Sequence, residues 1–202
     1  AWVHVDGAFG LWARASKTLS PLAAGLEAAD SWATDAHKWL NVPYDCGVAL
    51  VREPDNLRRA MSISGAYLLA SGQRDQLDYS PDSSRRARAV DVWASLKSLG
   101  RSGLAEMIDR NCRQASQLAE SLRCANIEIL NDVELNQVMV VFGDADRTNR
   151  VIEAVQIDGT CWAGATVWRN RTAMRISVSG WATTDADIER SLEAILKAHR
   201  DA

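Results

Sequence analysis

The sequence predicts an α/β protein made of two parts, a mostly parallel-sheet unit followed by a smaller α+β unit. In the first part, short apolar segments at 2–5, 31–36 and 47–51 have the character of strands, and a helical segment separates the first two. Strand, helix and strand in this order are typical of a βαβ unit with parallel strands. In the second part, from residue 103 onward, short strand-like segments alternate with helical ones.

Local signals place the remaining elements of the first unit. Ser20 followed by Pro21 predicts a helix over 20–29, because serine caps helices and proline suits their first turn. A second, short helix is expected from Pro54 to Met61. The stretch 62–84 has little periodicity, and a loop of that length is usually functional.

Two helical segments are expected next, 90–99 and 104–122, the latter with apolar residues at helical spacing. We place the boundary near 101–104, so that the predicted domains are 1–102 and 103–202. The expected strands of the second unit are 127–130, 137–142, 161–168 and 173–179, with helices at 147–157 and 185–198.

Composition excludes several classes of function. The 202 residues carry a net charge of −3, which argues against nucleic acid or an anionic membrane as the main partner. No apolar run approaches the ~20 residues that cross a bilayer. The four cysteines form no CxxC pair and only three histidines accompany them, so no metal site is predicted. We interpret the cysteines as reduced thiols of a cytoplasmic protein.

The segment SWATDAHKWLNVPYDCG, residues 31–47, places Lys38 between His37 and Trp39. Lysine is rarely buried, because removing its ammonium from water is costly unless it is paired or loses its proton. A lysine held in an apolar pocket becomes a usable nucleophile. Alternatively, the aliphatic stem packs on Trp39 while the charge reaches water.

Asp6 ends the apolar strand HVD, and Lys38 follows the next predicted strand. A βαβ crossover places both residues at the carboxyl edge of the sheet, where ligands of α/β proteins collect. They could form a plain buried ion pair. They could instead flank pyridoxal 5′-phosphate (PLP), with the lysine as a Schiff base and the aspartate on the pyridinium nitrogen.

The segments HVDGAFG and DSWATDAHKWLNVPYDCG together resemble the PLP-dependent amino-acid decarboxylases related to the aromatic-L-amino-acid and glutamate decarboxylases. The resemblance continues through AYLLAS, DYSPDSSRRARAVDVWASLKSLG and MRISVS, and so covers essentially the whole chain. It implies the fold-type I architecture of aspartate aminotransferase. Residues 1–102 would then be the C-terminal part of the large PLP-binding domain, and 103–202 the small C-terminal domain.

The resemblance implies how the cofactor is held. Lys38 would form the Schiff base, Asp6 would pair with the pyridine nitrogen, and Ala8 would lie against one face of the ring. His37 would contact the cofactor phosphate, with a structural hydrogen-bonding histidine as the alternative. Asp35 departs from the pattern, since many relatives carry Asn there. A carboxylate would repel the phosphate, so we expect Asp35 to point away and leave it out of the site.

The resemblance also implies catalytic and substrate-binding groups. Tyr67, in AYLLAS, would protonate the α-carbon of a quinonoid intermediate, and Tyr44 would line the substrate pocket. Either tyrosine could instead simply pack its ring. Arg85, Arg86 and Arg88 repeat a basic run of the family, and could support the cofactor phosphate, a dimer interface or a solvated helix start.

The implied activity is PLP-dependent decarboxylation of an L-amino acid to its amine and CO₂ by a homodimer with its active site at the interface. Another fold-type I PLP enzyme, such as an aldehyde synthase or a C–C lyase, is the enzymatic alternative. The chain begins without Met and inside a predicted strand, and the phosphate loop and ring-stacking histidine of the family lie upstream of HVD. We therefore expect the C-terminal part of a longer polypeptide, inactive alone; a truncated homologue serving only dimerisation is the other alternative.

Overall fold

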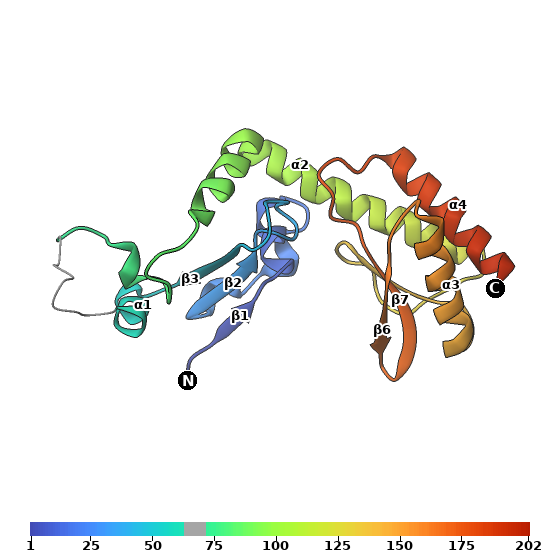
Figure 1. Cartoon of the computed structure of the whole chain (residues 1–202), viewed down its shortest axis with the longest axis horizontal. Helices are drawn as coiled ribbons and strands as arrows, with labels where there is room; N and C mark the ends of the chain where they lie inside the picture. The colour runs from blue at the N-terminus through green and yellow to red at the C-terminus, as the bar shows by residue number, and fades with distance from the viewer. Residues whose placement is uncertain (63–71) are drawn as a thin grey trace. The chain divides into compact units, whose positions relative to one another are not determined.

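The structure is a computed structural model that describes residues 1–62 and 72–202. The chain divides into two compact units, residues 1–101 and 102–202. The first unit contains a three-stranded sheet and the second a four-stranded sheet with helices (Figure 1). No helix in the described ranges is both long enough and apolar enough to cross a membrane.

The sheet of the first unit contains β1 (His4–Asp6), β2 (Ser31–Asp35) and β3 (Gly47–Val51), in that order. β1 and β2 run parallel, with Asp6 opposite Ala33, as the βαβ interpretation predicted. β3 runs antiparallel to β2, with Asp35 opposite Gly47. The described part of this sheet therefore contains one parallel and one antiparallel strand pair, where the sequence predicted a mostly parallel sheet.

The connection from β1 to β2 differs from the prediction of a helix over 20–29. It consists of three 3₁₀ turns: η1 (Gly10–Ala15), η2 (Ser20–Ala23) and η3 (Leu26–Ala28). Gly25 separates the last two turns with φ of 87°, a left-handed conformation that ends a helical segment and that glycine adopts without a Cβ clash. The proline at position 21 still opens a helical turn, as expected.

After β3 come α1 (Pro54–Met61), which has the predicted bounds, the short η4 (Gln76–Asp78) and α2 (Arg88–Cys124). Gly100 interrupts α2 with φ of 63° and ψ of −178°, so the helix consists of two segments. The two predicted helical segments, 90–99 and 104–122, correspond to these two parts. Glycine is suited to this break because the left-handed region carries no steric cost for it.

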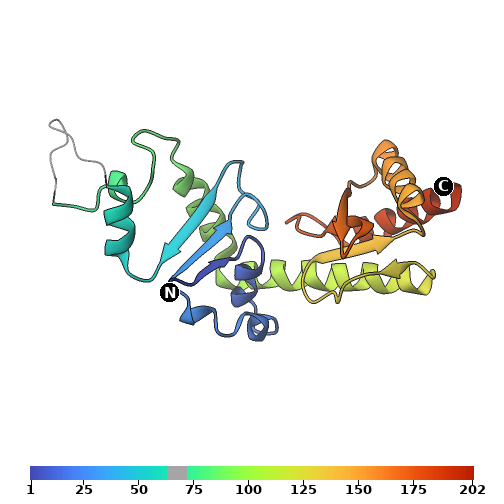
Figure 2. The same ribbon diagram turned by 90° about the horizontal axis from the view of Figure 1, so that it is seen from below.

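The second unit contains an antiparallel sheet in the order β4-β5-β7-β6, seen from a second direction in Figure 2. Its strands are β4 (Glu128–Ile129), β5 (Gln137–Val141), β6 (Gly164–Trp168) and β7 (Arg171–Ser177). Helices α3 (Ala145–Asp158) and α4 (Asp185–Asp201) pack against each other, and both contribute to one core. That core centres on fully buried side chains from the two central strands and the helices, including Val138, Val140, Val151, Val155 and Met174.

Candidate active site

The carboxyl ends of β1 and β2 lie at the same edge of the first sheet because these strands are parallel. Asp6 is the last residue of β1, and the turn that carries Lys38 begins directly after Asp35, the last residue of β2. Topology thus brings the two predicted cofactor residues to one edge. The Asp6 carboxylate is on an exposed residue and accepts a hydrogen bond from Ala8 N at 3.2 Å.

The segment after β1 is bonded directly to β2. Gly7 N donates to Ala33 O at 2.8 Å, and Thr34 Oγ1 donates to Ala8 O at 3.4 Å. Gly7 is buried, and a Cβ at this position would lie 2.7 Å from Leu11 Cβ. A glycine is therefore needed for η1 to pack this closely, and that packing keeps Asp6 and Ala8 beside β2.

The surroundings of Lys38 differ from the expected apolar pocket. Its Nζ lies 2.6 Å from Asp35 Oδ2, and its side chain is 39% exposed in the described structure. The ammonium also lies 5.6 Å from the centre of the Phe9 ring, within the range of a cation–π contact. The plain Asp6–Lys38 ion pair considered from the sequence is wrong for the described part of the chain, since the carboxylate at Lys38 belongs to Asp35.

Asp35, which was left out of the site predicted from the sequence, is thus the carboxylate beside Lys38. The family pattern directed attention to the cofactor phosphate, whereas the carboxylate contacts the lysine three residues later. Lys38 N donates to Asp35 O at 3.1 Å, so the turn itself brings the two side chains together. The pair could have been expected from the sequence because Asp35 and Lys38 carry opposite charges and lie three residues apart.

The turn is anchored by the residue after the lysine. Trp39 is fully buried, and its ring lies 5.9 Å from that of Phe9. Leu40 is also buried. Asn41 has φ of 57°, and its backbone N–H donates to Lys38 O at 3.1 Å. Burial of Trp39 therefore fixes the backbone beside Lys38 while leaving the lysine side chain accessible.

His37 lies against the far end of the same turn. Its Nδ1 is 3.0 Å from Cys46 N and 2.9 Å from Cys46 O, and its ring centre is 4.1 Å from that of Tyr44. If Cys46 N–H donates to Nδ1, the neutral ring carries its proton on Nε2, which can then donate to an anion. If Nδ1 donates to Cys46 O, Nε2 can donate only from the imidazolium.

The other predicted site residues are placed as follows. Tyr44 is 81% exposed and contacts the His37 ring, so the described part of the chain shows no enclosed substrate pocket around it. Tyr67 lies outside the described residues. Arg86 and Arg88, for which three alternatives were open, both contact Asp45 in the turn after Lys38.

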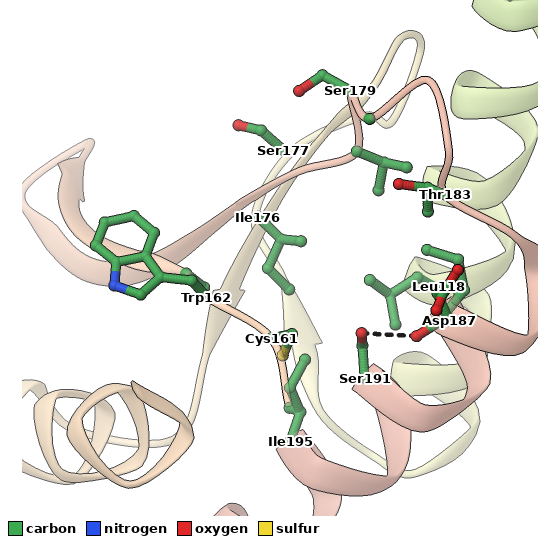
Figure 3. Close-up of a pocket in the computed structure, with 14 residues that line it drawn as sticks. Leu118, Cys161, Trp162, Ile176, Ser177, Ser179, Thr183, Asp187, Ser191 and Ile195 are labelled. Atoms are coloured by element: carbon green, nitrogen blue, oxygen red, sulfur yellow. Dashed lines mark hydrogen bonds between the residues drawn. The ribbon is translucent and has the colours of Figure 1, made fainter. Parts of the chain in front are cut away.

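A separate pocket of about 190 Å³ lies within the second unit (Figure 3). Apolar side chains such as Leu118, Ile176 and Ile195 line it together with the polar Thr183 and Ser191. Ser191 Oγ donates to Asp187 O at 2.7 Å, and burial raises the pKa of the nearby Cys161 thiol. None of the residues predicted for the cofactor site lines this pocket. Nor do the described residues contain a group of three His, Cys, Asp or Glu arranged to hold a metal ion.

Comparison with known sequences relates most of this chain to one family. A profile described as the pyridoxal-dependent decarboxylase conserved domain matches residues 1–143. An aromatic-L-amino-acid decarboxylase of Drosophila lebanonensis is 28% identical over 204 residues, covering 98% of this chain and 50% of that protein. One of Bacillus atrophaeus is 32% identical over 143 residues, covering 68% of this chain and 30% of that protein. The chain spans half or less of the length of these curated relatives.

Solved structures share the fold. The crystal structure of Oryza sativa TDC with PLP and tryptamine superposes with a TM-score of 0.91 at 21% identity, covering 100% of this chain and 45% of that one. The structure of mouse CSAD gives a TM-score of 0.87 at 24% identity, covering 100% of this chain and 46% of that one. These likenesses confirm the predicted α/β fold class, while the assignment of 1–102 and 103–202 to particular domains stays a prediction.

Proposed function

This chain belongs to the family of the pyridoxal-dependent decarboxylase conserved domain, and on that premise we propose that it is part of an enzyme that decarboxylates an L-amino acid with PLP. The resemblance predicted from the sequence is thereby confirmed. The activity, substrate and partners are proposed for the whole protein, of which this chain corresponds to about half a relative's length. One observation carries the proposal: Asp6 and the Lys38 turn follow neighbouring parallel strands, at one sheet edge.

The residues at this edge have the chemistry that PLP requires. Lys38 supplies an amine that solvent-sized molecules can reach, since its side chain is 39% exposed. Asp6 supplies an exposed carboxylate that accepts a hydrogen bond from the backbone N–H of Ala8. A carboxylate has several acceptor positions, so others are left for a protonated ring nitrogen. We assign Lys38 to the covalent bond with the cofactor and Asp6 to its pyridine nitrogen.

Two further residues complete the proposed cofactor site. Ala8 follows Asp6 by two residues and is held to β2 through Thr34, so its small side chain would face the ring. His37 would donate from Nε2 to the cofactor phosphate, because its Nδ1 is already engaged by Cys46. An imidazolium would also donate from Nε2, since both of its ring nitrogens carry a proton.

When bound, PLP supplies an electron sink for the electron pair of the bond that breaks at the substrate α-carbon. The protein must hold the substrate carboxylate away from water and deliver a proton to the α-carbon. We assign that proton delivery to Tyr67, on its resemblance to the family, and a place at the substrate to Tyr44. The Tyr44 ring lies tilted against that of His37, with centres 4.1 Å apart, which would put Tyr44 beside the proposed phosphate end of the cofactor. A homodimer with the active site at its interface is part of the same proposal.

The test is an absorbance spectrum of the natural protein with PLP, beside a Lys38→Ala variant. We expect a visible-edge band from the lysine-bound cofactor, which borohydride fixes to Lys38 and which the variant lacks. Release of CO₂ and an amine from an L-amino acid, without ammonia or peroxide, would then separate decarboxylation from the aldehyde-synthase alternative. Absence of the band in the natural protein would leave only the fold in common, as the dimerisation-module alternative requires.

A further inference from the structure

Arg88, the first residue of α2, and Arg86, two residues before it, converge on the turn that follows Lys38. Arg88 Nε donates to Asp45 O at 3.0 Å and Arg88 Nη2 to Asp45 Oδ2 at 3.1 Å. Arg86 Nη2 donates to the same carbonyl oxygen at 3.0 Å, and its Nη1 donates to Asp91 Oδ2 at 2.6 Å. Both guanidinium groups therefore donate to the Asp45 carbonyl oxygen, and each also binds a carboxylate, that of Asp45 for Arg88 and that of Asp91 for Arg86. A solvated helix start does not require these contacts.

Hydrogen bonds and the peptide links between adjacent residues connect these arginines to Lys38. Asp45 is followed by Cys46, whose amide and carbonyl both face His37 Nδ1. Cys46 O also accepts from Ala36 N at 2.9 Å, which closes the turn at its base. Residues 36 and 46 are thus bonded across the turn, and Lys38 lies inside the loop that they close.

Further contacts tie the same turn to α2. The Cys46 thiol donates to Arg88 O at 3.8 Å, and burial raises the pKa of this thiol, so it stays the protonated donor. Ser95 Oγ donates to Leu40 O at 3.3 Å. The hydrogen bond from Arg88 also holds the pKa of the Asp45 carboxyl below its usual range, which keeps it ionised for the pair.

We propose that Arg88, assisted by Arg86, is a positioning residue for the cofactor lysine: it binds Asp45, and through Cys46 and His37 it holds the turn that carries Lys38. The inference rests on the proposed function only in giving Lys38 and His37 their cofactor contacts. The carboxylates that the two arginines contact are those of Asp45, Asp91 and Asp82. Their effect on the cofactor is therefore indirect.

The test uses Arg88→Gln in the natural protein, with Arg171→Gln as the matched control. In the second unit, Arg171 makes a comparable bidentate pair with Glu128, from Nη1 to Oε1 at 2.6 Å and from Nη2 to Oε2 at 2.7 Å. Hydrogen exchange of the Ala36 and Cys46 amides is measured without cofactor, and PLP affinity is measured from the absorbance band. We expect Arg88→Gln to accelerate exchange and to weaken PLP binding, about tenfold each.

Arg171→Gln should leave the exchange of the two amides and the PLP affinity unchanged, even if it lowers global stability as much as Arg88→Gln does. Arg88→Lys keeps the charge near Asp45 but loses the fork that reaches its carbonyl, so its effects should be intermediate. Unchanged exchange at both amides in Arg88→Gln would overturn the inference, and so would an equal loss of PLP affinity in the control. If Arg88→Gln does not fold, Asp45→Asn, which removes only the carboxylate, must show the same two changes or the inference is wrong.

Failure of this inference is distinguishable from failure of the proposed function. If the natural protein forms no PLP band, the proposed function fails, while the exchange comparison still decides whether Arg88 holds the turn. If the band forms and is equally strong in Arg88→Gln with unchanged exchange, the cofactor assignment stands and the positioning role does not.

Discussion

Replacing Asp35 by Asn should make Lys38 more reactive toward aldehydes. The substitution keeps the shape of the side chain but removes the negative charge that lies 2.6 Å from Lys38 Nζ. The ion pair holds Lys38 Nζ against the carboxylate, and the amine must leave this contact before it can attack an aldehyde carbon. Asp35 therefore competes with any aldehyde, including that of PLP, for the lysine.

The size of the effect follows from the geometry and the exposure of the pair. At 2.6 Å, Coulomb's law gives about 1.6 kcal/mol in water and about 6 kcal/mol at an effective dielectric constant of 20. Because the two side chains are 39% and 31% exposed, screening by water places the pair near the lower figure. Measured exposed pairs contribute about 0.2–1 kcal/mol. Taking about 1 kcal/mol, we expect the fraction of Lys38 that is free of this contact, and with it the rate of reaction with an aldehyde, to rise about fivefold.

The assay is reductive methylation of the cofactor-free protein by formaldehyde and cyanoborohydride, followed by peptide mass spectrometry. Lys17, which is exposed, serves as the internal reference in each sample. Glu128→Gln is the matched control, since it removes an ion-paired carboxylate from the second unit. An unchanged or slower rate at Lys38 in Asp35→Asn, relative to Lys17, would show that Asp35 does not restrain the lysine.

Three other predictions concern stability and reactivity. Gly7→Ala should lower the free energy of unfolding in urea by about 1–3 kcal/mol, because its Cβ would lie 2.7 Å from Leu11 Cβ; an unchanged midpoint would contradict the close packing of η1. Burial raises the pKa of Cys112 to about 12, so iodoacetamide at pH 8 should label the exposed Cys124 first and Cys112 only after unfolding, as peptide mapping can check. Burial, and then the charges of nearby arginines, lower the pKa of His199 below 6.5 in the folded state. Because the unfolded state then binds the proton more readily, the free energy of unfolding falls as the pH drops from 6.5 through the folded-state pKa. His199→Gln should flatten that part of the curve of unfolding free energy against pH.

Elements with strong local signals were predictable from the sequence. Pro54 and Met61 bound α1 as expected, because a proline at the first turn and an uninterrupted helical segment decide it locally. The expected helix over 20–29 was wrong because Gly25 adopts φ of 87° and divides the segment into 3₁₀ turns. The direction of β3 was not predictable either, since its apolar residues suit a parallel or an antiparallel neighbour equally.

The candidate site was likewise predictable only in part. That Asp6 and Lys38 belong to one sheet edge followed from strand order alone, because parallel strands end on the same side. The partner of Lys38 did not follow from strand order, since it depends on how a short turn orients two side chains. Likewise, the run containing Arg86 and Arg88 lies some forty residues after Asp45, and nothing local in the sequence joins them.

These contacts restrain Lys38 at two different points. Asp35 acts on the side chain, at Nζ, whereas Arg88 acts on the backbone of the turn through Asp45 and Cys46. A covalent bond to a cofactor requires the side chain to leave its carboxylate while the backbone stays in place, because bond formation depends on a defined position of the amine. The weak, partly exposed pair at Nζ and the several hydrogen bonds at the turn satisfy these two requirements separately. A lysine in a dry apolar pocket could react without first leaving a counter-ion, whereas Lys38 must first separate from the Asp35 carboxylate.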